Sequence, residues 1–99
     1  MAIRVQHERA GEPIAYRWGY WHLSVFQQVA FWEINGRQVE MDRFDKPLSQ
    51  QTAEDKAEFD LYCEAGRDKT VTASDDYEIT DPSDGEVVTI KKGDVIHIW

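Results

Sequence analysis

Cysteine is nearly absent from this 99-residue chain, which limits disulfide bonding and thiol chemistry. Cys63 stands alone, so no intramolecular disulfide can form and nothing points to an oxidising compartment. The thiol falls in a predicted helix between Tyr62 and Glu64, where neither a helix dipole nor a neighbouring acid lowers its pKa. We therefore interpret Cys63 as a packed thiol rather than a nucleophile.

Long apolar runs are also missing. No segment approaches the roughly 18 apolar residues of a membrane span. The polar residues 1–11 predict that no secretory signal is present. These two observations favour a soluble cytoplasmic protein with no membrane partner.

Motifs for metals, phosphates and nucleophilic catalysis are lacking as well. His7, His22 and His97 are far apart in the sequence, and the glycines form no phosphate-binding loop. The sequence therefore predicts no metal, no cofactor and no enzymatic activity. A small enzyme that uses His22 as a general base remains an alternative.

Basic residues are few: 11 Lys and Arg stand against 19 Asp and Glu, a net charge of −8. Phosphates reward clustered Lys and Arg, so direct nucleic-acid binding is not expected. The imbalance lies in residues 39–99, which carry seven bases and sixteen acids. A basic protein surface is the partner that this charge favours.

The densest acidic segment covers residues 75–86, which contain six carboxylates and no base. They are Asp75, Asp76, Glu78, Asp81, Asp84 and Glu86. Like charges this close repel one another, and a partner rich in Lys and Arg would relieve that repulsion and associate faster. We predict that these six residues bind the partner, with Phe31 or Tyr77 as an exposed aromatic anchor. A solubilising role alone is the other interpretation.

Aromatic residues are plentiful, and seven of the twelve fall within residues 16–32. They suit the core of one small domain over residues 1–99. A pocket for a small ligand around Trp18, Trp21 and Trp32 is an alternative.

Strand signals dominate the chain. Residues 14–20 alternate in polarity, and residues 1–12 predict a weak edge strand. Asn35-Gly36 predicts a hairpin over residues 29–41 that turns Trp32 inward and leaves Phe31 on the polar side. Further strands are expected over residues 70–73, 77–80, 86–91 and 94–99. The segment Ile90-Lys91-Lys92-Gly93-Asp94-Val95-Ile96 resembles the strand–turn–strand element of SH3-like barrels and cupins, a likeness too short to imply a function.

One helix is predicted over residues 53–65, capped by Thr52 and Asp55 and ended by Gly66. The expected fold is therefore α+β, with an antiparallel sheet of five or six hairpin-connected strands packed against this helix. The predicted core contains Trp18, Trp32, Val39, Leu61, Val88, Ile90 and Ile96.

In size and charge the chain resembles phage inhibitors of host defence nucleases, including anti-CRISPR and anti-restriction proteins, and immunity proteins that block nuclease toxins. The resemblance implies a non-enzymatic inhibitor whose acidic face covers a nucleic-acid-binding surface. Full nucleic-acid mimicry would require a second subunit, or would require the helix to add its acids to the same face. These are Glu54, Asp55, Glu58, Asp60 and Glu64.

Overall fold

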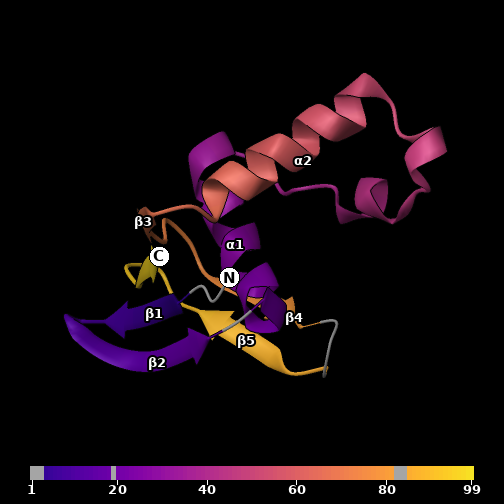
Figure 1. The fold of residues 1–99 in the computed structure, drawn as a ribbon. Coiled ribbons are helices and arrows are strands. Elements are labelled where there is room, and N and C mark those ends of the chain that lie inside the picture. Colours follow the sequence, from indigo (N-terminus) through magenta and orange to yellow (C-terminus); the bar gives the residue numbers. More distant parts are fainter. Residues whose placement is uncertain (1–3, 19, 82–84) are drawn as a thin grey trace.

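The structure is a computed structural model that describes residues 4–18, 20–81 and 85–99, and of residues 15–18 and 20–24 the backbone alone. The chain forms an elongated molecule of 45 × 26 × 23 Å (Figure 1). In chain order the elements are β1 (Arg4–Arg9), β2 (Glu12–Trp18), α1 (Tyr20–Asn35), the 3₁₀ turns η1 (Met41–Asp45) and η2 (Leu48–Gln50), α2 (Ala53–Ala65), β3 (Lys69–Thr72), β4 (Tyr77–Thr80), β5 (Val87–Ile90) and β6 (Val95–Ile98).

The strands form two antiparallel sheets. The larger has the order β2-β1-β6-β3, and β4 and β5 form a separate two-stranded ribbon. The predicted α+β class with antiparallel strands is confirmed, whereas the single sheet packed against one helix is replaced by sheets of four and two strands with two α-helices. The predicted strand near the N-terminus exists, but it lies between β2 and β6 instead of at an edge.

β1 and β2 form a tight hairpin. Arg9 pairs with Glu12, so Ala10 and Gly11 alone make the turn. Both have positive φ, 54° and 81°, as a two-residue type I′ turn requires. In β1, Val5 and His7 are buried and their neighbours are more exposed, which gives the strand one inner face.

Residues 20–35 form helix α1, so the predicted hairpin over residues 29–41 is wrong. Gly36 has φ 71° and its N–H donates to the Trp32 carbonyl at 2.8 Å, while the Asn35 amide donates to the Phe31 carbonyl. A helix end and a type I′ turn both place glycine at positive φ, so Asn-Gly suits either. Burial on several sides stabilises the helix despite its β-branched and aromatic residues.

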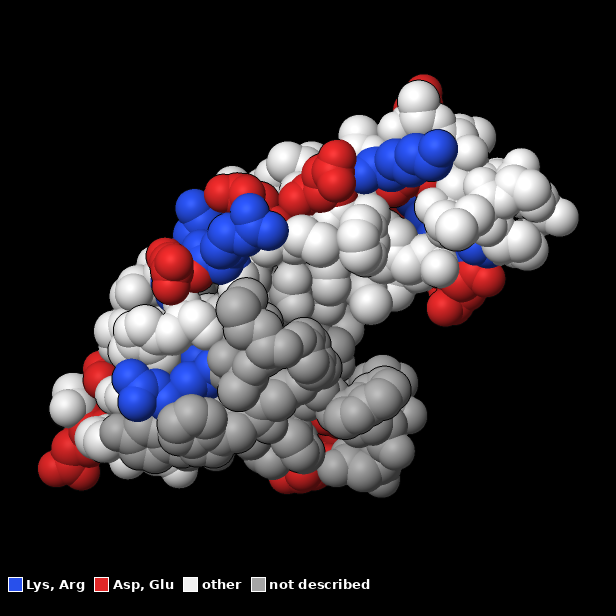
Figure 2. Space-filling model, viewed as in Figure 1, with Lys and Arg blue, Asp and Glu red and all other residues white. Residues whose placement is uncertain are grey.

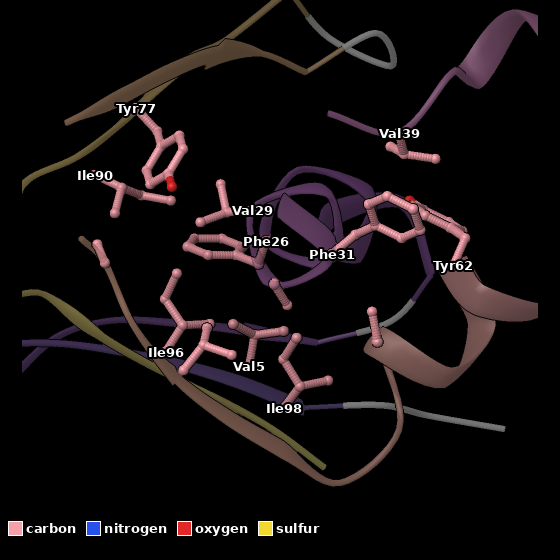
Figure 3. Packing of buried hydrophobic residues seen from close by; sticks show 14 residues of the cluster. Val5, Phe26, Val29, Phe31, Val39, Tyr62, Tyr77, Ile90, Ile96 and Ile98 are labelled. Atoms are coloured by element: carbon pink, nitrogen blue, oxygen red, sulfur yellow. The ribbon is translucent and has the colours of Figure 1, made fainter. Parts of the chain in front are cut away.

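The core gathers around α1 and the inner faces of both sheets (Figure 3). Val39, Ile90 and Ile96 are buried as predicted, and Trp32 and Val88 are partly buried against them. Two predictions are wrong. Phe31 is fully buried instead of facing solvent, because it lies on a helix beside α2, and Leu61 is 43% exposed. The Trp18 side chain lies outside the described residues.

Helix α2 matches its predicted bounds. Thr52 and Asp55 form a full capping box: the Asp55 N–H donates to the Thr52 hydroxyl at 3.1 Å and the Thr52 N–H donates to the Asp55 carboxylate at 3.0 Å. With η1 and η2 the helix forms an arm that extends from the sheets (Figure 1). No helix in the described part of the chain has the length and apolar character to cross a membrane.

Residues 4 and 99 meet at one end of the larger sheet. The Arg4 N–H donates to the Trp99 carbonyl at 3.2 Å, and the Trp99 N–H donates back at 2.9 Å. The Arg4 guanidinium also lies 4.2 Å from the centroid of the Trp99 ring, a cation–π contact.

Candidate acidic binding site

The acidic stretch enters and crosses the β4–β5 ribbon. Asp75 and Asp76 precede β4, and Glu78 lies on the exposed face of that strand opposite Thr89. The Asp76 carboxylate accepts the Lys92 N–H at 2.8 Å, and the Asp75 carboxylate accepts the Asp76 N–H at 2.8 Å. Within the described residues, no Lys or Arg lies within ion-pair distance of Asp75, Asp76 or Glu78.

The six predicted acids are not equivalent. Glu86 is exposed like the first three, but Asp81 is only 3% exposed and Asp84 lies outside the described residues. The Asp81 backbone closes the ribbon: its N–H donates to the Glu86 carbonyl at 2.7 Å and its carbonyl accepts the Gly85 N–H at 2.9 Å. Asp81 therefore belongs to the turn rather than to an accessible acidic surface.

A cleft of about 390 Å³ opens beside the first two acids. Its lining comes from the end of α1 and from the segment that leads into β4: Trp32, Glu33, Gly36, Ser74, Asp75, Asp76 and Tyr77. The half-buried Trp32 ring meets the Tyr77 ring edge-on, with centroids 5.1 Å apart. The cleft therefore combines an oriented indole with three carboxylates, and its described lining includes no cation.

Glu33 is the best-anchored acid of this cleft. Burial opposes its ionisation, but hydrogen bonds from the Ser74 N–H at 2.8 Å and from the Ser74 and Tyr77 hydroxyls outweigh burial and lower the pKa of Glu33. The same burial, together with the bond to Glu33, raises the pKa of Tyr77. Glu33 thus stays negative at neutral pH. Sequence reasoning missed it because Ser74 and Tyr77 lie 41 and 44 residues away.

Neither predicted anchor ring is accessible. Phe31 is buried against the arm, and Tyr77 is only 8% exposed with its hydroxyl bound to Glu33. Trp32, which the sequence placed in the core, is the ring that lines the acidic cleft. The reversal follows from the helix: consecutive residues of a helix point about 100° apart, so Phe31 and Trp32 face different neighbours.

The acids of α2 do not extend this site. Glu58 accepts two hydrogen bonds from the Arg37 guanidinium, one of 2.7 Å, and these outweigh its burial and lower the pKa of Glu58. Asp55 accepts the Thr52 N–H and lies 3.4 Å from Lys46 and 3.8 Å from Arg43. Both carboxylates are buried. Figure 2 shows acids interspersed with Lys and Arg along the arm, not one acidic surface.

A second ionic cluster is centred on Asp94, in the turn between β5 and β6. Asp94 is 1% exposed and accepts Arg9 Nε and Nη2 at 2.9 Å each, His7 Nε2 at 2.7 Å and the Lys91 N–H at 2.9 Å. The Arg9 hydrogen bonds are the main reason that the pKa of Asp94 lies well below its usual range.

The described residues provide little support for an aromatic ligand pocket, a catalytic histidine, a reactive cysteine or a metal site. Trp21 and His22 fall in α1, and their side chains lie outside the description, as does that of Trp18. Burial raises the pKa of the Cys63 thiol, which disfavours a thiolate. In the part of the chain that the structure describes, no three His, Cys, Asp or Glu side chains are grouped to hold a metal ion. No protein-family model, curated protein or solved structure matches this chain.

Proposed function

We propose that this protein is a non-enzymatic binding module that engages a basic surface of a partner protein through Asp75, Asp76, Glu78 and the cleft beside Trp32. The observation that carries the proposal is the cleft itself, in which Asp75, Asp76 and Glu33 share the lining with a half-buried indole and none of the described lining residues is a cation. A guanidinium or ammonium group from a partner would find both opposite charge and an aromatic ring there.

The consequence of such binding is inhibition. A partner that uses the same basic surface to hold nucleic acid would lose access to it when the acidic cleft occupies it. This mode is that of phage anti-defence proteins and of nuclease immunity proteins, the two classes that the chain resembles in size and charge. Because Asp55 and Glu58 are already paired within the arm, the proposal is a compact contact site and not an extended mimic of duplex DNA.

Charge reversal tests the proposal. In Asp75→Lys/Glu78→Lys, two exposed acids change sign without removing the Asp76 carboxylate that accepts the Lys92 N–H. Asp60→Lys/Glu64→Lys is the matched control, because it makes the same change in net charge on exposed positions of α2. The wild type and both variants are immobilised and exposed to bacterial lysate at low and at moderate salt.

We expect the wild type and the α2 control to retain a basic nucleic-acid-binding protein that moderate salt elutes. The Asp75/Glu78 variant should bind the purified partner at least tenfold more weakly, with a flatter dependence of affinity on salt concentration. Equal binding by both variants at low salt would reject the acidic cleft as the contact site.

A further inference from the structure

Strand β5 has an open edge. Among the described residues it pairs with β4 alone. The Asp81 N–H donates to the Glu86 carbonyl, which makes these residues a hydrogen-bonded pair at the end of the ribbon. Hydrogen-bonded and non-hydrogen-bonded pairs alternate along an antiparallel ladder, so Val87 and Thr89 occupy non-hydrogen-bonded pairs. Their backbone N–H and C=O groups therefore point away from β4, toward the open edge.

This edge borders a cleft of about 280 Å³. From β5 and its flanks the cleft is lined by Glu86, Val87, Val88, Thr89 and Lys91, and from the facing elements by His7, Arg9, Ile14 and Phe26. Figure 1 draws β5 beside the β1–β2 hairpin that supplies the facing wall. The run of successive β5 residues in the lining shows that the cleft follows the strand, which at about 3.4 Å per residue spans about 13 Å.

The facing wall contains a buried histidine. His7 is 4% exposed, and its Nε2 lies 2.7 Å from a carboxylate oxygen of Asp94. Asp94 is ionised and can only accept, so His7 Nε2 donates this hydrogen bond. No described residue hydrogen-bonds Nδ1.

Two cations, Arg9 and Lys91, and one acid, Glu86, line the cleft, and the two cations favour an acidic segment. Arg9 commits Nε and Nη2 to Asp94 but is 45% exposed and retains Nη1. Lys91 is exposed on the same lining, and no described acid lies within ion-pair distance of it. A carboxylate placed between these two cations would gain charge-assisted hydrogen bonds.

We propose that this cleft receives an extended segment of another protein, which adds to the open edge of β5 as a strand and places an acidic side chain beside Arg9 and Lys91. An added strand would hydrogen-bond the outward-pointing backbone N–H and C=O groups of Val87 and Thr89. Backbone pairing would then provide the affinity, and Arg9 and Lys91 would select for an acidic side chain. This site is separate from the Trp32 cleft, so the two proposals stand or fall independently.

A proline variant tests the backbone pairing. Thr89→Pro removes an N–H that points to the open edge. This N–H donates no hydrogen bond to β4, so the ribbon itself loses none. Thr80→Pro is the matched control, because by the same alternation its N–H points away from β5 on the opposite edge of the ribbon. The probe is a random heptapeptide library displayed on phage and selected against the full-length chain. We expect the enriched peptides to carry Asp or Glu, and Thr89→Pro to weaken their binding at least tenfold while Thr80→Pro leaves it unchanged.

Amide hydrogen exchange gives a second measurement that needs no variant. A selected peptide should slow exchange at Val87 and Thr89 and have little effect at Val88 and Ile90, whose N–H groups already face β4. Failure to enrich any peptide, equal binding to both proline variants, or protection elsewhere would overturn the proposal. A dimer in sedimentation that Thr89→Pro dissociates would overturn it in favour of a second copy. Enriched basic peptides that respond only to Asp75→Lys/Glu78→Lys would report on the Trp32 cleft instead.

Discussion

Asp94 joins three parts of the chain at a single carboxylate. It accepts hydrogen bonds from His7 and Arg9 of β1 and from the N–H of Lys91 in the turn before β6. The sequence shows Asp94 only as one acid after a glycine, because its partners His7 and Arg9 lie 87 and 85 residues away. A buried carboxylate with such partners is identifiable only once the strands are in register.

We expect Asp94→Asn to destabilise the fold by about 3 kcal/mol at pH 7, since it removes the negative member of a buried ionic cluster. The folded-state pKa of Asp94 is depressed, so its contribution is complete above the unfolded-state pKa of about 3.9 and is lost as the pH falls toward the folded-state value. Urea unfolding of the wild type and variant at pH 7 and pH 3 measures this difference, which should shrink at the lower pH. The exposed Asp42→Asn serves as the control, and a gap that stays constant with pH would contradict the assignment.

At the scale of elements, the contact between α1 and α2 depends on one small residue. Gly66 ends α2 with φ −91°, a conformation open to any residue, so its backbone does not require glycine. The side chain of Gln27 on α1 is what restricts this position, because a Cβ at Gly66 would lie 2.5 Å from Gln27 Nε2. Gln27 Nε2 in turn donates to the Tyr62 carbonyl at 2.7 Å. The sequence correctly indicated a glycine at this helix end, but the reason is the close approach of α1.

A double-mutant cycle measures this packing. We expect Gly66→Ala to cost about 2 kcal/mol by overpacking and Gln27→Ala to cost about 1 kcal/mol by loss of its hydrogen bond. In the double variant the alanine Cβ no longer meets the amide, so the combined cost should fall below the sum. Denaturant unfolding of the four proteins gives the coupling free energy. Additive costs would show that Gln27 is not what restricts position 66.

Local patterns predicted α2 and the strands better than they predicted α1. The capping box of Thr52 and Asp55 marked the start of α2 and Gly66 its end. Alternation over residues 14–20 located β2, and strand signals between turns located the four C-terminal strands. Asn35-Gly36 gave a wrong prediction because the same dipeptide suits both a helix end and a type I′ turn. The β-branched and aromatic residues before it are helical because the tertiary fold buries them, which the local sequence does not show. For the same reason, the Trp32 cleft joins residues from α1 and from the approach to β4 that no sequence pattern links.

At the scale of the whole molecule, ionic contacts join α2 to the chain that precedes it. Arg37 and the Glu40 N–H both donate to Glu58, and Lys46 and Arg43 approach Asp55, so buried carboxylates of α2 face the chain that precedes it. Rings supplement them, with the Phe44 ring edge-on to Phe59 at 5.2 Å. Tyr62 and Ala65 of α2 also belong to the apolar core around α1.

Glu58→Gln should therefore loosen the arm more than the body. Glu58 is 3% exposed, and weakening its charged hydrogen bonds should lower the local opening free energy of α2 by about 2 kcal/mol. Residue-resolved hydrogen exchange should show faster exchange over α2 and little change in β1 and β6. Glu54→Gln, on the exposed side of the same helix, is the control. Uniform acceleration across both sheets would show that the arm does not open separately.

The mutual backbone bonds of Arg4 and Trp99 hold these two residues side by side. Because these residues are already neighbours, a short linker between them would close only a small loop at modest entropic cost. New termini could then be cut in the η1–η2 segment, where Leu48 is 80% exposed and no strand is interrupted. A circular permutant of this design would carry both free ends on the arm and leave the β1–β6 pairing covalently bridged.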